Sequence, residues 1–123
     1  MTTRQPLSET QPAAPPPTPT PRVVDLAFDV THQRVLGGGM TTVTMRSGAV
    51  TLRAGEAVGR HTTGSNEEAL VVMSGRGELR IEGGASVALA GPCVAYCPPK
   101  TWHDVHNVGV EPLCYVYVVA LAE

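Results

Sequence analysis

Two histidines and a glutamate are the residues of this 123-residue chain best suited to binding a divalent metal. His61 and Thr63 lie two positions apart in a segment that we expect to be a strand, and His103 and Asn107 lie four positions apart in another. Side chains two positions apart point to the same face of a strand, so each pair shares a face. If folding brings both imidazoles together with the carboxylate of Glu68, the three groups can hold one ion.

Glu68 stands at the start of an apolar run, residues 69–73. An unpaired charge buried beside such a run is very costly, so this carboxylate must either sit at the wet end of the strand or be compensated by a cation. Glu67 precedes it and, by alternation, points to the opposite face. We interpret Glu67 as a solvated charge.

The elements that must position these groups are strands. Valine occurs 17 times, and short β-branched runs are separated by turn residues such as Ser47-Gly48, Ser74-Gly75 and Pro98-Pro99. This pattern predicts a small antiparallel sandwich or barrel, an all-β fold. The predicted strands are Arg22–Asp29, Met40–Arg46, Val50–Arg53, Ala57–Thr63, Glu68–Met73, Gly77–Glu82, Ser86–Leu89, Val94–Cys97, Trp102–Asn107 and Leu113–Leu121.

The N-terminal part has a different composition. Seven of the 11 prolines lie at or before Pro21. Proline lacks a backbone donor and fixes φ, so this stretch is expected to be extended or disordered. We therefore predict a disordered proline-rich tail over residues 1–21 and one folded domain over residues 22–123.

Composition restricts the possible partners and the compartment. Charged residues make up 16% of the chain, the net charge is −2, and no basic block occurs, which argues against a nucleic-acid partner. No apolar run is long enough to span a membrane and no segment resembles a signal peptide, so we expect a cytoplasmic protein. Three cysteines without a C-x-x-C spacing are expected to be reduced and packed, although Cys97 is close enough to the second histidine segment to approach the site.

The ordered set of residues resembles the two motifs of the cupin family, G(X)5HXH(X)3–4E(X)6G and G(X)5PXG(X)2H(X)3N. The first set here is Gly55, His61, Thr63, Glu68 and Gly75, and the second is Pro98, Lys100, His103 and Asn107. Thr63 replaces the second histidine of the first motif, and Lys100 replaces the glycine after proline. The resemblance covers residues 22–123.

The resemblance implies a jelly-roll β-barrel with a metal near one mouth. It places His61, Glu68 and His103 at metal-ligand positions, with one divalent transition metal, Fe, Mn, Ni, Cu or Zn, as the cofactor. Thr63 is either a hydrogen-bond donor to a ligand or a β-branched filler. Tyr96, Cys97 and Asn107 are further candidates for contact with the substrate or with the metal ligands. The resemblance also places Asn107 at a structural position, where an asparagine can bond loop backbone.

Two functions follow from this resemblance. Two histidines and one carboxylate hold one face of an ion and leave the other face open, which favours an oxygenase or isomerase acting on a small polar or anionic molecule. The alternative is a non-catalytic cupin that binds a sugar or effector at a degenerate metal site. The family resemblance further implies a homodimer, with the segment Arg22–Val30 crossing to the partner.

Overall fold

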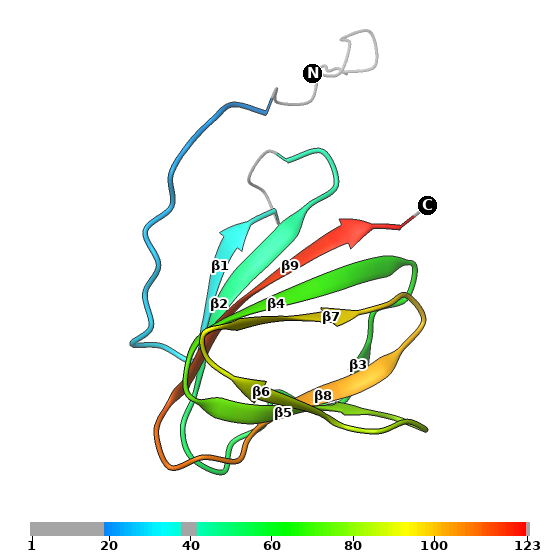
Figure 1. Cartoon of the computed structure of the whole chain (residues 1–123). Helices are drawn as coiled ribbons and strands as arrows, with labels where there is room; N and C mark the ends of the chain where they lie inside the picture. The colour runs from blue at the N-terminus through cyan, green and yellow to red at the C-terminus, as the bar shows by residue number, and fades with distance from the viewer. Residues whose placement is uncertain (1–18, 38–41, 123) are drawn as a thin grey trace, which may run out of the picture.

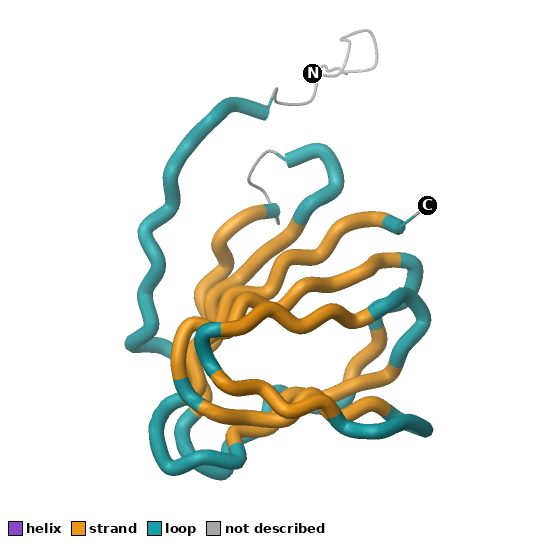
Figure 2. The backbone as a smooth tube through the Cα atoms, in the orientation of Figure 1, coloured by secondary structure: helices purple, strands orange, loops and turns teal. Residues whose placement is uncertain are grey.

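The computed structural model describes residues 19–37 and 42–122, and in these residues it contains nine strands and no helix (Figures 1 and 2). No helix in this part has the length and apolarity that crossing a membrane requires. The strands are β1 (His32–Leu36), β2 (Arg46–Leu52), β3 (His61–Thr62), β4 (Asn66–Ser74), β5 (Arg76–Ile81), β6 (Val87–Ala90), β7 (Cys93–Cys97), β8 (Trp102–Asn107) and β9 (Leu113–Leu121).

The strands form two antiparallel sheets that face each other. One sheet has the order β1-β2-β9-β4-β7 and the other has the order β3-β8-β5-β6. Figure 1 shows the two sheets as opposite walls of a barrel, with β7 and β6 at the near edges. The fold is therefore the all-β jelly-roll barrel that the turn spacing and the motifs predict.

Alternation along the strands builds the core between the sheets. In β4, Leu70 and Val72 are at most 1% exposed, while Val71 between them is only partly buried. Leu79 of β5 and Val105 of β8 supply the facing side from the second sheet. Burying a leucine side chain stabilises the fold by about 1.5–3 kcal/mol, so this layer fixes the two sheets against each other.

The strand register places the candidate ligands on the inner walls. Glu68 of β4 lies opposite Cys97 of β7 on one side and Val119 of β9 on the other. In the second sheet, His61 of β3 lies directly opposite His103 of β8. One level of the barrel thus carries the carboxylate on one wall and both imidazoles on the other.

Two of the predicted strands near the N-terminal side are wrong. Arg22–Asp29 contains no strand; it runs beside β1 as an irregular segment, blue in Figure 1. The side chain of Gln33 takes the place of a partner strand there, because it donates to the Asp25 carbonyl at 2.9 Å and accepts from the Ala27 amide at 2.7 Å. Of the predicted strand Met40–Arg46, residues 40 and 41 lie outside the described residues, and the next four form a loop.

Strand β2 runs through Ser47-Gly48, which we predicted to be a turn. Gly48 lies opposite Tyr117 of β9, and a Cβ at this position would sit 2.5 Å from the Tyr117 hydroxyl. The glycine therefore serves a close approach between strands rather than a turn.

The remaining boundaries differ less. The predicted strand Ala57–Thr63 is reduced to His61–Thr62 and an isolated bridge between Ala57 and His106. The predicted tail, residues 1–21, lies outside the described residues up to position 18, and residues 19–21 are not in a strand.

Candidate metal centre

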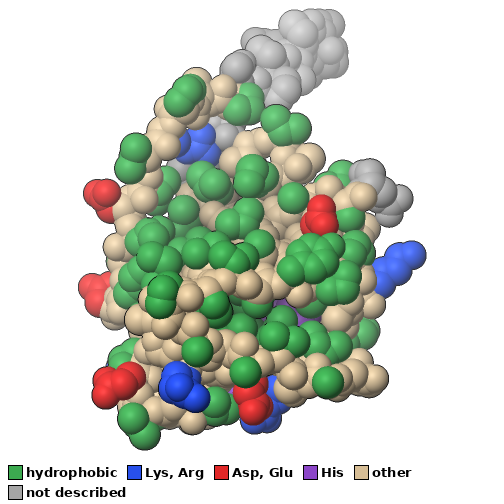
Figure 3. All heavy atoms as spheres, in the orientation of Figure 1, with side chains coloured by type: hydrophobic (Ala, Val, Ile, Leu, Met, Phe, Trp, Pro, Cys, Tyr) green, Lys and Arg blue, Asp and Glu red, His purple; other side chains and the backbone are tan. Residues whose placement is uncertain are grey.

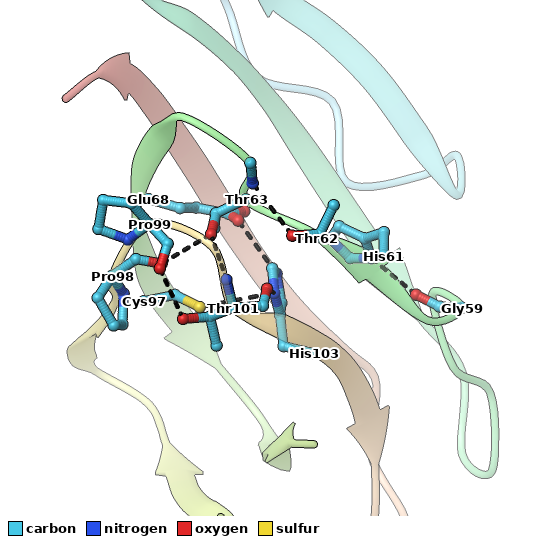
Figure 4. A network of polar contacts seen from close by, with 11 residues as sticks. Gly59, His61, Thr62, Thr63, Glu68, Cys97, Pro98, Pro99, Thr101 and His103 are labelled. Atoms are coloured by element: carbon cyan, nitrogen blue, oxygen red, sulfur yellow. Dashed lines mark hydrogen bonds and ion pairs between the residues drawn. The ribbon is translucent and has the colours of Figure 1, made fainter. Parts of the chain in front are cut away.

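The two histidines meet across the β3–β8 pair. Their ring centroids are 4.2 Å apart and the rings are tilted by 59°. Figure 4 shows both rings close to the carboxylate of Glu68, with a dashed line joining this carboxylate to His103. The antiparallel register brings them together although they are 42 positions apart in the chain.

Backbone carbonyls orient both imidazoles. His61 Nδ1 lies 2.7 Å from the Gly59 carbonyl oxygen, and His103 Nδ1 lies 3.0 Å from the Thr101 carbonyl oxygen. A carbonyl oxygen only accepts, so each Nδ1 carries the proton and each Nε2 keeps a lone pair when the ring is neutral. Metal-binding histidines in proteins are usually held in this way.

Glu68 closes the group from the opposite sheet. Glu68 is 9% exposed, and its Oε1 lies 3.2 Å from His103 Nε2. One ligand atom from each of His61, Glu68 and His103 lies within 4.8 Å of the other two. The structure thus brings together all three residues at the predicted ligand positions.

The buried Nε2 of His103 tests whether this group fits a cation. It has no hydrogen-bond partner, because the approach to Glu68 is close but poorly directed. A neutral imidazole there would point a lone pair at a carboxylate, which is unfavourable unless a proton or a metal lies between them. The Glu68 carboxylate accordingly raises the pKa of His103. The residues present fit a divalent metal.

Cys97 lies against the other side of the His103 ring. The thiol is fully buried, and Sγ is 3.5 Å from His103 Nδ1. Burial, with a smaller contribution from Glu68, raises the pKa of Cys97 to about 11. At neutral pH the group is therefore a neutral thiol that packs behind a ligand.

Thr63 has a role that neither sequence alternative described. Its side chain is 7% exposed; Oγ1 donates to the Pro98 carbonyl at 2.7 Å and accepts from the Thr101 amide at 3.1 Å (Figure 4). The hydroxyl proton is used within the protein instead of being offered to a ligand. Thr63 instead fixes the loop whose Thr101 carbonyl orients His103.

The loop between β7 and β8 also explains Lys100. This residue has φ of +55°, in the left-handed region, and its amide donates to the Gly64 carbonyl at 2.7 Å. Glycine adopts this conformation without strain, whereas other residues lose roughly 1 kcal/mol or more. The departure from the motif changes the residue and keeps the backbone geometry.

Two other candidates lie away from the site. Tyr96 lies on the outer face of its sheet, is 58% exposed, and donates its hydroxyl proton to Glu67 at 2.8 Å. It is absent from the pocket lining, unlike the candidate role that the sequence suggested. Asn107 is buried at the far end of β8. Its Nδ2 donates to the carbonyls of Leu52 and Glu111, and its Oδ1 accepts from the Gly109 amide. Asn107 thus fastens a loop and does not contact the metal ligands.

A cavity of about 500 Å³ opens beside His61 and Glu68. This volume lies in the range of small-molecule sites, about 300–1,000 Å³. The lining combines apolar and polar side chains. Among the lining residues that the sequence analysis did not assign to the site are His32, Arg46 and Tyr117. The alternation of Tyr115 and Tyr117 along β9 was the available signal, because both face inward.

Comparisons with known proteins agree with this geometry. The family model for the cupin domain matches residues 35–119. A search of curated proteins finds no match. A Cupin 2 conserved barrel domain protein from Salinispora arenicola is 25% identical, covers 80% of this chain and 82% of its own, and has a TM-score of 0.64.

Two further solved structures share the fold at lower identity. The cupin domain of Cnp3 from Schizosaccharomyces pombe is 16% identical, with coverage of 80% and 69% and a TM-score of 0.67. A predicted oxalate decarboxylase from Thermotoga maritima is 20% identical, with coverage of 80% and 99% and a TM-score of 0.60. The strand topology agrees with this fold, and the family match over residues 35–119 shows that the chain belongs to the cupin family.

Proposed function

We propose that this protein is a mononuclear metal-dependent enzyme, of the oxygenase or isomerase type, that acts on a small polar or anionic molecule. The observation that carries this proposal is the pair of carbonyl-oriented imidazoles that lie, each with one ligand atom, within 4.8 Å of a nearly buried carboxylate. Two histidines and one carboxylate are a donor set for iron, manganese, nickel, copper or zinc.

The chain's own residues hold the ligands and exclude water. Gly59 and Thr101 fix the imidazole orientations, and the apolar side chains of Val58, Val105 and Val119 line the adjoining cavity. A divalent ion bound here would supply a Lewis acid that polarises a substrate oxygen. Because Thr63 is committed to the loop, three protein ligands leave positions open for substrate.

Metal content tests the proposal directly. Wild-type protein, purified and then reconstituted, should contain about one transition-metal ion per chain, and His103→Ala should lose it, because His103 donates the most buried ligand atom. His106→Ala is a matched control: it removes a histidine from the same strand, whose Nε2 lies 2.9 Å from Asp104 instead. A wild type that binds no ion, or a His103→Ala variant that keeps it, would overturn the proposal.

A second candidate is a non-catalytic cupin that binds a small molecule without a metal. The observation in its favour is that Thr63 occupies the position of the family's second histidine and binds the loop. A ligand that binds the folded state raises the melting temperature. A thermal-shift screen with sugars and small acids, run with and without EDTA, separates the two, since stabilisation that survives EDTA supports the binder.

A further inference from the structure

The cavity has a second polar end that the metal ligands do not use. Arg46, His32 and Tyr117 line it together with His61 and Glu68. These three residues come from the first two strands and from β9, away from the β3–β8 pair. Any molecule that fills the cavity from the metal ligands outward meets them.

The strand register gives the separation between the two ends. Arg46 lies opposite Val119, and Val119 lies opposite Glu68 on its other side. Arg46 and Glu68 are thus two strand spacings apart on one inner wall, roughly 10 Å between Cα atoms. The long arginine side chain can span part of this distance, so one small molecule can contact both the metal position and the guanidinium.

Charge favours an anion in this cavity. Glu68 is the only acidic residue in the lining, whereas Arg46 and Arg60 are both cationic. Arg60 is neutralised by Glu82 at 2.6 Å, but Arg46 takes part in no ion pair among residues 19–37 and 42–122. A divalent ion next to one carboxylate leaves further positive charge, which Arg46 increases.

Tyr117 adds a directed donor beside Arg46. Its hydroxyl lies 2.7 Å from His32 Nε2, and the two rings stack with centroids 5.8 Å apart. If Nε2 carries the proton, the imidazole donates to the phenol oxygen and the phenol proton is free for a ligand. Gly48 provides the space for this hydroxyl. Burial raises the pKa of Tyr117, which keeps the phenol protonated.

We infer that Arg46 and Tyr117 form an anion subsite that binds the far carboxylate of the substrate. The substrate class is a small acid with a metal-binding oxygen pair at one end and a carboxylate at the other. This inference rests on the proposed function, because the near end of the substrate is placed by the metal ligands.

Two matched probes test the subsite by calorimetry on the zinc-loaded full chain. Pentanohydroxamate and glutaric monohydroxamate have the same length and the same metal-binding group, and differ in a terminal methyl or carboxylate. Wild type should bind the carboxylate probe at least about tenfold more tightly, the size expected of a charge-assisted hydrogen bond. Arg46→Gln should remove most of this preference and leave the affinity for pentanohydroxamate unchanged. Tyr117→Phe should reduce the preference in part.

Two more variants make the result specific. Arg53→Gln removes an exposed arginine just beyond the other end of β2, outside the cavity lining, and should keep the full preference. Arg46→Lys keeps the charge and should retain part of it, even if the glutamine variant folds poorly. Equal binding of both probes to wild type, or an undiminished preference in Arg46→Gln, would overturn the subsite while the metal site stands. Failure of zinc-loaded wild type to bind either probe would overturn the proposed function together with the subsite.

Discussion

Replacing Thr63 with valine removes one hydroxyl and keeps the shape of the side chain. In the structure that hydroxyl holds two backbone groups of the loop before β8, the Pro98 carbonyl and the Thr101 amide. The Thr101 carbonyl in turn accepts from His103 Nδ1. Thr63→Val therefore tests whether the residue at the family's ligand position acts on the metal site through this loop.

The magnitude follows from the two lost hydrogen bonds. A buried group left without a partner costs about 1–3 kcal/mol, and the partly buried Thr101 amide bears a share of this cost. Pro98 is exposed, so water can replace the hydroxyl at its carbonyl. We expect the free energy of unfolding of the metal-free protein to fall by about 2 kcal/mol. Metal affinity should fall roughly tenfold, as when a ligand loses its orienting partner.

Urea unfolding of the metal-free variant and titration with zinc measure the two effects separately. Thr63→Ser keeps the hydroxyl and should therefore retain most of the wild-type stability and zinc affinity, which Thr63→Val should lose. A Thr63→Val protein with wild-type stability and wild-type zinc affinity would refute the role of the loop.

Three further predictions concern protonation, thiol chemistry and assembly. In metal-free protein, Glu68 raises the pKa of His103 above its usual 6.5. The stabilisation by the protonated imidazole is therefore complete below about pH 6.5 and is lost as pH rises through the raised pKa. Metal affinity should increase over the same pH range, because the metal binds the neutral imidazole. Urea unfolding and zinc titration at several pH values measure the two trends. Cys97, buried and with its pKa raised to about 11, should resist iodoacetamide at pH ~8 until the chain unfolds, and peptide mapping that finds it modified in folded metal-free protein would contradict this. Val94 and Tyr96, which are 69% and 58% exposed, are apolar side chains on the outer face of the larger sheet, where we expect two chains to pair. Light scattering should give the mass of two chains for wild type and the mass of one chain for Val94→Lys. A wild-type mass of one chain would refute pairing.

Much of the barrel could be predicted, because alternation and turns are local signals. The strands Trp102–Asn107 and Leu113–Leu121 have the predicted bounds. Their buried residues alternate with less buried ones along much of each strand, and turn residues flank both. Arg22–Asp29 is also rich in strand-forming residues, but its backbone is bonded by the side chain of Gln33 instead of by a neighbouring strand. No local sequence pattern indicates this contact.

The site shows a similar division. The three candidate ligand positions followed from the resemblance to the cupin motifs, in which each motif fixes a residue relative to its own turn. The direction of Tyr96 depended on the pairing of Glu68 with Cys97, because a shift of one residue would exchange the inner and outer faces. The inward position of Arg46 required the register between β2 and β9, which are distant in the chain.

In Figure 3 hydrophobic side chains cover much of the visible face, and a small histidine surface shows between the two layers. Among the candidate ligands, His103 is 2% exposed and Glu68 is 9% exposed, so bulk water screens the interaction between these two side chains only weakly.

X-ray absorption at the zinc edge, on protein loaded with one equivalent of zinc, tests the central claim most directly. The three residues His61, Glu68 and His103 predict a coordination sphere with two imidazole nitrogens and oxygen, and without sulfur. A sulfur neighbour at about 2.3 Å would show that Cys97 binds the ion. That result, or a spectrum with fewer than two imidazoles, would contradict the assigned centre.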